Sequence, residues 1–322
     1  MSFGIENVLQ SLVTGVLEGG FFALAAVGLS LIFGVQRILN VAHGSLIVLA
    51  AFFTIQFSIV ITPSLGLDPL SSIGIDFFAL AILGAVIYLA MIYKIENTGF
   101  EAPLLATFGL SILIQYLIPN GLDILGVQLI PRLQPSGSIS SIVQNQSYSQ
   151  TSLHLGGIIL AVPQLIAFLV AIVAIPLVHL FLSRTYTGKS IRATAQDWQA
   201  AEFSGIDVRR TRLVSFVLGT ALAGLAGGIY AFTTPVSPTD GNTTLLSIIL
   251  AVIILGGVGN ILGTLIGGLV VGIIVSVGNF IALEVLSHFQ FPGDFGSLIA
   301  FIVFLIVLMV RPTGLFGITL RK

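Results

Sequence analysis

The chain has 322 residues, of which 56% are hydrophobic and only 8% are charged, and its net charge is −1. A soluble domain carries roughly 25% charged residues because its surface faces water, so this composition excludes an ordinary soluble protein and indicates one that lies mostly in a lipid bilayer. The chain has no cysteine, which excludes disulfides and Cys-ligated metals. Nothing in the charge balance points to nucleic acid as a partner.

The chain begins with MSFGIENVLQ, which lacks the basic region of a signal peptide and continues into an apolar segment, so we expect it to be retained. Nine apolar segments then approach the length of about 20 residues that a helix needs to cross a bilayer. They are residues 10–34, 38–62, 73–93, 102–119, 156–183, 213–235, 243–262, 263–285 and 295–311. The joins at 34–38 and 258–264 are short and rich in glycine, and they define the segments least sharply.

These segments are continuously apolar, whereas the strands of a membrane barrel alternate in polarity. A helix also pairs its backbone groups internally, as the bilayer requires. We therefore predict an all-α polytopic membrane protein of about eight to ten transmembrane helices, nine by this count, forming a single transmembrane domain over residues 1–322.

The basic residues predict the orientation. With the N-terminus outside and the C-terminus inside, eleven of the twelve Lys and Arg residues lie inside and only Arg132 lies outside, as the positive-inside rule requires. Residues 120–155, rich in Ser, Gln, Pro and Gly, then form an extracytoplasmic loop, which holds either a short helix or a folded surface segment. Residues 184–212 form a basic cytoplasmic loop.

Glycines recur at four-residue spacing in several segments, which favours close packing of helix backbones, although some of them could instead break helices that line a path. The pairs and series are Gly15/Gly19, Gly224/Gly228, Gly259/Gly263/Gly267 and Gly268/Gly272. Residues 34–48 also align without gaps to residues 257–271 with seven identities. This is either a trace of an internal repeat, as transporters often contain, or chance agreement between two apolar stretches.

Ionisable residues inside a membrane are candidates for function. Glu18 is the most deeply placed acid, and it either lies near the outer interface, is protonated, or faces a watery cavity. His43 lies just inside the second segment, where it serves packing or gating, or contacts a solute. Asn40 either caps a helix, which we favour, or makes a polar contact. Three further acids lie near outer ends and are expected to be solvated, namely Asp76, Glu284 and Asp294.

Thr107, Ser111 and Gln115 recur at four-residue spacing on one face of the fourth segment. They either line a polar path or bond between helices, which is the commoner use of such residues. The candidates for the path are Asn40, His43, Gly44, Thr107, Ser111 and Gln115. No catalytic constellation, metal-ligand set or cofactor motif is recognisable, so we expect neither an enzyme nor a metal or cofactor site.

The loop at 184–212 is the largest hydrophilic feature on the inner side. Ile191, Ala195 and Trp198 fall on one face of a predicted helix that Gly205 is placed to end. Such a helix suits either docking into a groove on a partner protein or lying on the membrane surface. Its TGKS sequence resembles the end of a phosphate-binding loop, but Ser183 stands where that motif has its first glycine. We therefore expect that the chain does not hydrolyse ATP, and that a partner or a gradient supplies the energy for any active process it performs.

The loop resembles the cytoplasmic loop of Liv-type permeases, the membrane subunits of branched-chain amino acid ABC importers. The matching positions are Gly188, Arg192, Ala193, Asp197, Ala200, Gly205 and Ile206. Further family-like stretches follow in order at 28–46, centred on Asn40, Ala42, His43 and Gly44, and at 104–115, 222–232, 255–268 and 311–317. The chain departs from the family at 93–103, where the family has a strongly basic segment and this sequence has one Lys and two Glu.

The resemblance implies the transmembrane subunit of an importer for branched-chain or other neutral amino acids in the plasma membrane of a prokaryote. The implied partners are two cytoplasmic ATP-binding subunits, a second similar permease and a periplasmic solute-binding protein. The residues expected to couple to the ATPase are Gly188, Arg192, Ala193, Asp197, Trp198, Ala200 and Gly205. The alternatives are a permease for amides, urea or sugars of the same superfamily, or an ion-coupled secondary transporter.

Overall fold

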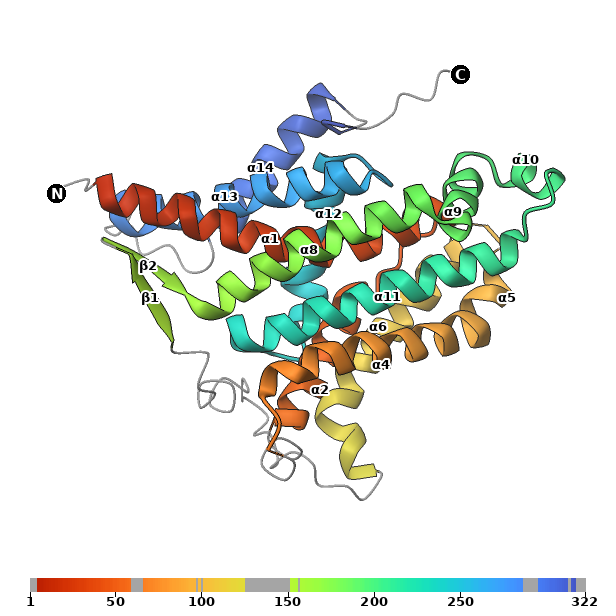
Figure 1. The fold of residues 1–322 in the computed structure, drawn as a ribbon, viewed down its shortest axis with the longest axis horizontal. Helices are drawn as coiled ribbons and strands as arrows, with labels where there is room; N and C mark the ends of the chain where they lie inside the picture. Colours follow the sequence, from red (N-terminus) through yellow and green to blue (C-terminus); the bar gives the residue numbers. More distant parts are fainter. Residues whose placement is uncertain are drawn as a thin grey trace.

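Long helices run side by side along the molecule in this computed structural model, with a two-stranded hairpin at one end and two short helices at the other (Figure 1). The structure describes residues 5–58, 66–96, 98–99, 101–124, 151–155, 157–285, 295–311 and 314–316. The elements in chain order are α1 (Ile5–Gln36), α2 (His43–Gln56), the 3-10 helix η2 (Pro69–Ser71), α4 (Ser72–Ile87), the π-helix η3 (Tyr88–Ile92), α5 (Tyr93–Ile95), α6 (Glu101–Ile124), β1 (Ser152–Leu155), β2 (Ile158–Ala161), α8 (Val162–Arg184), α9 (Tyr186–Gln196), α10 (Trp198–Phe203), α11 (Val208–Thr233), the π-helix η4 (Gly241–Leu245), α12 (Leu246–Gly256), α13 (Ile261–Val285) and α14 (Phe295–Val310). We call the end with β1 and β2 the hairpin end, and the end with α9 and α10 the loop end.

Within the part of the chain that the structure describes, six helices are long and apolar enough to cross a membrane. They are Glu6–Gln36, Pro69–Ile95, Glu101–Ile118, Val162–Arg184, Val208–Thr233 and Ile261–Ala282. Three shorter apolar helices accompany them, at His43–Gln56, Gly241–Gly256 and Phe295–Val310. This architecture agrees with an all-α polytopic membrane protein, while nine crossings and an external N-terminus remain predictions.

Three of the predicted segments have the wrong limits. The second does not begin at residue 38, because residues 37–40 have no regular structure, 41–42 form a turn and α2 starts at His43. The fifth does not begin at 156, because Ile158–Ala161 is a β-strand. The seventh ends at Gly256, where Gly257 adopts a φ of 88° that terminates the helix. Apolar residues lie on both sides of each of these boundaries, so the apolar pattern did not place them.

Close approach of helix backbones explains the glycine spacing. A Cβ atom on Gly15 would lie 2.7 Å from the Cα of Ile273, and one on Gly19 would lie 2.7 Å from the Cα of Leu269. Both glycines therefore let α1 pack directly against α13. Gly268 makes the reciprocal contact, because its Cβ would lie 2.6 Å from the Cα of Ala23. The predicted close packing is confirmed for this pair of helices.

The hairpin is fastened to the start of α1. Strands β1 and β2 pair in antiparallel register, with Ser152 opposite Ala161. The Gln10 side chain bonds the free edge of β2, because its amide donates to the Ile159 carbonyl at 2.7 Å and accepts from the Ile159 N–H at 2.8 Å. Of the predicted outer loop 120–155, residues 120–124 close α6 and 152–155 form β1, whereas 125–150 lie outside the described residues.

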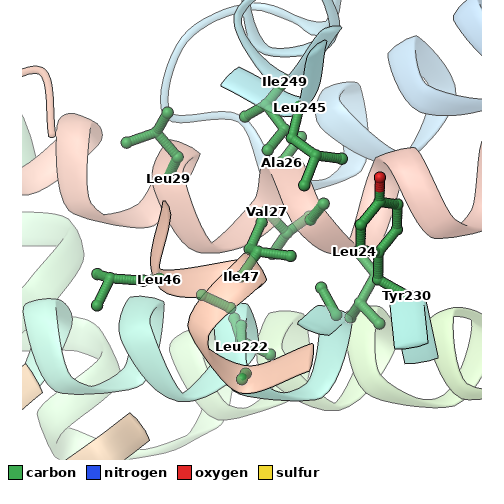
Figure 2. Close-up of a cluster of buried hydrophobic side chains, with 14 of the residues drawn as sticks. Leu24, Ala26, Val27, Leu29, Leu46, Ile47, Leu222, Tyr230, Leu245 and Ile249 are labelled. Atoms are coloured by element: carbon green, nitrogen blue, oxygen red, sulfur yellow. The ribbon is translucent and has the colours of Figure 1, made fainter. Parts of the chain in front are cut away.

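The centre of the bundle is formed by α1, α2, α11, η4 and α12 (Figure 2). Val27 of α1 lies close to Ile47 of α2, and Ala26 of α1 lies close to Leu245 of η4, all buried. The two short helices α2 and α12 thus contribute to the core rather than to the lipid-facing surface. Their burial positions the polar groups described next.

Candidate functional site

Two helices begin inside the bundle with their N-terminal ends in contact. The first residue of α2, His43, reaches the carbonyl of Ala25, well before α1 ends at Gln36. A Cβ on Gly44 would lie 2.9 Å from the carbonyl carbon of Gly241, the first residue of η4. Each helix N-terminus carries a partial positive charge, so this junction places two such ends together in the membrane-embedded core, as discontinuous transporter helices do.

A chain of side-chain hydrogen bonds crosses the junction. Ser45 Oγ donates to Asn242 Oδ1 at 3.0 Å, and Asn242 Nδ2 donates to Gln115 Oε1 at 3.1 Å. These three residues connect α2, η4 and α6. Polar groups in an apolar interior are stable only when paired, so the chain fixes the relative position of the three elements.

The segment between α1 and α2 is held by further polar contacts. Thr107 Oγ1 of α6 accepts from the Val41 N–H at 3.2 Å, and Asn40 Oδ1 accepts from the Ala42 N–H at 3.2 Å. His43 Nε2 donates to the Ala25 carbonyl at 3.0 Å, because a carbonyl only accepts. His43 Nδ1 and Asn40 Nδ2 are buried without a hydrogen-bond partner among the described residues. Such groups are suited to bind a water molecule or a solute.

The structure therefore brings five of the six path candidates together around the start of α2: Asn40, His43, Gly44, Thr107 and Gln115. Ser111 is buried but bonds only back to the Phe108 carbonyl of its own helix, at 2.9 Å. Ser45 and Asn242 belong to the junction and were missed. Asn242 had a signal, since it follows a stretch rich in Pro, Ser, Thr and Asp that breaks the apolar pattern.

The expectation that Asp76 is solvated is wrong. Asp76 is only 2% exposed on α4, because α2 and α11 cover it. The hydroxyl of Thr54 donates to its Oδ2 atom, and a Cβ on Gly228 would lie 2.9 Å from the same oxygen. Asp294 and the side chain of Glu284 lie outside the described residues.

The loop at 184–212 holds two helices rather than the single helix expected. Asp197 Oδ1 accepts from the N–H groups of Gln199 at 2.9 Å and Ala200 at 3.0 Å, so it caps a new helix, α10. Ile191 and Trp198 therefore do not share one helix face as predicted, because Ile191 is buried on α9 whereas Trp198 begins α10. Gly205 ends α10 with a φ of 81°, as predicted.

The remaining loop candidates have distinct surroundings. Gly188 is required by packing, because a Cβ there would lie 2.9 Å from the carbonyl carbon of Leu182 in α8. Arg192 of α9 and Ala200 of α10 are exposed, and Ala193 is half-buried. Gly188 thus folds α9 back onto α8, while Arg192 and Ala200 face outward.

The α9–α10 loop and the start of α11, which follows it, contact α1 and the α4–α5 helix. Arg37, directly after α1, donates to the Gln196 carbonyl of α9 at 3.4 Å, and Gln36 at the end of α1 donates to the Arg212 carbonyl of α11 at 3.2 Å. Arg212 also forms a salt bridge of 3.2 Å with Glu96, which follows α5. Displacement of the loop would therefore reach the end of α1 through Gln196, and the α4–α5 helix through α11.

The tip of the loop presents apolar surface. Trp198 is 42% exposed and Phe203 is 92% exposed, both on α10, and α10 stands clear of the bundle at the loop end (Figure 1). Exposed aromatic side chains on a short rigid helix are typical anchors for a partner protein.

A cavity of about 200 Å³ lies toward the hairpin end, between α1, α8, α11, η4, α12 and α13. Glu18 lines it, and Gln164 Nε2 donates to Glu18 Oε1 at 3.3 Å. The sequence leaves three possible environments for Glu18, and in the structure Glu18 lines a cavity.

Comparisons with known proteins identify the family of the chain. A family model described as "Branched-chain amino acid transport system / permease component" matches residues 11–308. The chain belongs to this permease family. Its members are transport components rather than enzymes, and membership places the chain in the prokaryotic plasma membrane as a multi-pass protein.

Full-length relatives support the same assignment. The permease is 27% identical to the high-affinity branched-chain amino acid transport system permease protein BraD of Pseudomonas aeruginosa, over 97% of both chains. It is 28% identical to the probable branched-chain amino acid transport permease protein LivH of Methanocaldococcus jannaschii, over 95% of this chain and 92% of the relative. LivH of Salmonella typhimurium is 27% identical over 96% and 95%. No solved structure matches the permease.

Proposed function

We propose that this permease is the transmembrane subunit of an ABC importer that moves branched-chain or other neutral amino acids across the plasma membrane. Two ATP-binding subunits bind at the loop end, a second similar permease completes the path, and a periplasmic binding protein delivers the solute at the hairpin end. The observation that carries the proposal is the α9–α10 loop, which exposes Trp198 and Phe203 and contacts the end of α1 through Gln196. The start of α11, which follows the loop, bonds to Gln36 and to Glu96 through Arg212.

The contacts supply a route from the loop to the junction. A displacement of α10 would move the start of α11, because the two are joined by a short stretch of chain. It would also move the end of α1, because Gln36 bonds to Arg212 and Arg37 bonds to Gln196, and the α4–α5 helix, because Arg212 pairs with Glu96. The segment that follows α1 leads directly to Asn40 and the start of α2. Rigid-body motion of this kind is a common switching mechanism, and here it would open or close the junction of α2 with η4.

The junction is suited to be the narrow point of the path. The backbones of Gly44 and Gly241 close it, and Ser45, Asn242 and Gln115 line it with groups that could exchange partners with a zwitterionic solute. Such exchange replaces one hydrogen bond with another, which keeps the net cost small.

Purification of the complex assembled in its native membrane tests the proposal. The complex should contain ATP-binding subunits and a second permease, and in proteoliposomes it should accumulate leucine only when ATP is present on the loop side. Mass spectrometry of the solute bound to the copurified binding protein identifies the substrate. A bound amide, urea or sugar would redirect the substrate assignment while leaving the importer assignment intact.

A gradient-driven transporter is the second candidate, because such proteins use buried carboxylates and Asp76 is one. The two candidates differ in energy source. Solute uptake by an ATP-driven importer should persist when ionophores collapse the Na⁺ and H⁺ gradients. Uptake should also persist in the Asp76→Asn variant. Uptake that needs a gradient and Asp76, but not ATP, would favour the second candidate.

A further inference from the structure

We propose that the outward side of α9, together with the end of α8, binds the headgroup of an anionic phospholipid. The surface consists of Arg184, Tyr186, Lys189 and Arg192, and we call it the α9 basic face. The inference rests on the membrane character of the chain and is independent of the proposed substrate and energy source. It gives the two helices of this loop different partners, because α9 contacts lipid whereas α10 contacts protein.

The start of α9 lies at the boundary of a membrane-crossing helix. Helix α8 has 23 residues and is apolar enough to cross a membrane. Its length of about 35 Å slightly exceeds the roughly 30 Å of the hydrocarbon core. Because α9 begins at Tyr186, two residues after α8 ends, its first turn follows within about 7 Å of chain. The first turn of α9 therefore lies at the level of the lipid headgroups.

Helix α9 has two sides of different character. Its inner side packs against the bundle, where α9 contacts α8, α11 and α1. The buried residues of this side are Gly188, Ser190, Ile191 and Thr194. On the outward side, Tyr186 is 80% exposed, and Lys189 and Arg192 are also exposed. These three follow one another at three-residue spacing, so they lie along one side of the helix.

The positive charge of the α9 basic face has no acid beside it in the chain. No Asp or Glu occurs between residues 162 and 196. Among the described residues, Arg184, Lys189 and Arg192 form no salt bridge, in contrast to Arg212. Cations placed near an anionic membrane surface attract its headgroups, and a bond from Lys or Arg to phosphate is charge-assisted. The α9 basic face is therefore complementary to a phosphate group.

An apolar stripe on α8 leads to this face. Its exposed residues follow at three- or four-residue spacing, and they are Leu169, Val173, Leu177 and Leu180. Arg184 comes four residues after Leu180, so it ends the same stripe. A phospholipid would use both parts, with its acyl chains on the stripe and its headgroup on the cations, and Tyr186 suits the interface between them. A free phosphate or an acidic protein segment would leave the stripe unused.

Lipid titration of the full-length permease, purified in an uncharged detergent without ATP-binding subunits, tests the inference. The probes are dioleoylphosphatidylglycerol, dioleoylphosphatidylcholine and inorganic phosphate. The readout is the thermal unfolding midpoint, which rises when a ligand binds only the folded protein. We expect phosphatidylglycerol to raise the midpoint saturably and more than phosphatidylcholine, and phosphate at equal concentration to have no effect. Arg184→Gln/Lys189→Gln should weaken the apparent affinity for phosphatidylglycerol at least tenfold.

Two further double variants serve as controls. Lys94→Gln/Arg210→Gln removes the same number of exposed cations from the loop end, and each of these residues has an acid within three positions in the sequence. This variant should keep the affinity of wild type. Arg184→Lys/Lys189→Arg retains both charges and should also bind like wild type, which separates loss of charge from damage to the fold.

Equal affinity of wild type and Arg184→Gln/Lys189→Gln for phosphatidylglycerol would overturn the inference. So would an equal effect of inorganic phosphate, or a lipid preference that survives roughly 1 M NaCl, where the Debye length is about 3 Å. Release of the ATP-binding subunits from the assembled Arg184→Gln/Lys189→Gln complex, with lipid affinity unchanged, would assign the face to a protein partner instead. Because the titration contains neither ATPase nor solute, its failure leaves the importer proposal standing, and failure of ATP-driven uptake leaves a lipid-binding result intact.

Discussion

Glu96 and Arg212 form a salt bridge of 3.2 Å at the loop end, and both side chains are largely buried, with exposures of 4% and 12%. Tyr88 also donates to Glu96 Oε2 at 2.9 Å, and the Arg212 guanidinium lies 5.7 Å from the ring centre of Trp198. Glu96 is one of the two acids in the stretch 93–103. The structure pairs it with Arg212 near the start of α11.

Loss of one member of this pair should destabilise the loop end. Glu96→Gln removes the carboxylate of a buried ion pair, and breaking such a pair costs roughly 3–5 kcal/mol. We expect a clear drop in the thermal unfolding midpoint of the permease in detergent. Glu101→Gln, an exposed acid at the start of α6, serves as the control and should change little.

The double variant Glu96→Gln/Arg212→Gln separates the pair from its parts. Because neither charge is then left alone, the double variant should recover part of the stability that Glu96→Gln loses. Strict additivity of Glu96→Gln and Arg212→Gln, each also measured alone, would show that the salt bridge does not couple α11 to the α4–α5 helix.

Asp197 should matter as a helix cap rather than as a charge. Asp197→Ala removes the acceptor for the Gln199 and Ala200 N–H groups and should cost α10 about 1 kcal/mol. Asp197→Asn keeps an acceptor oxygen and should behave like wild type. Hydrogen exchange over residues 198–203 measures the difference, and equal protection in both variants would contradict the capping role.

The junction predicts a strong position effect for glycine. Gly44→Ala places a methyl group against the carbonyl of Gly241, so it should either lower the folded yield or force α2 and η4 apart and abolish uptake. Gly109→Ala on α6 meets no atom within 4 Å and should be neutral, or stabilising by about 0.5–1 kcal/mol through helix propensity. Similar uptake by the two variants would show that the Gly44–Gly241 contact has no role.

Much of the fold could be predicted because the bilayer demands long apolar helices, and six of them are present among the described residues. The start of α2 at His43 could not be predicted, because apolar residues lie on both sides of it. The break between α1 and α2 depends on contacts with Gly241 and Thr107, which are distant in sequence. The same reason hid the burial of Asp76, which is set by Thr54 and by the glycines of α11.

The loop was predictable in part. Gly205 was placed to end a helix and does so with a positive φ. The break at Asp197 had a local signal that was missed, since Asp is among the favoured N-cap residues. The contact between Arg212 and Glu96 had no local signal in the sequence, because the two residues are distant in the chain and meet only when α11 packs against α4.

The central claim, that the α9–α10 loop couples ATP hydrolysis to movement of the path, is tested most directly by the Trp198→Asp variant of the assembled complex in proteoliposomes. The measurement is the number of leucine molecules imported per ATP hydrolysed, with Trp198→Phe as the control that keeps an aromatic anchor. We expect Trp198→Asp to insert normally and to hydrolyse ATP while its import falls close to zero, because a charge replaces the apolar contact with the partner. An unchanged import ratio in Trp198→Asp would contradict the account.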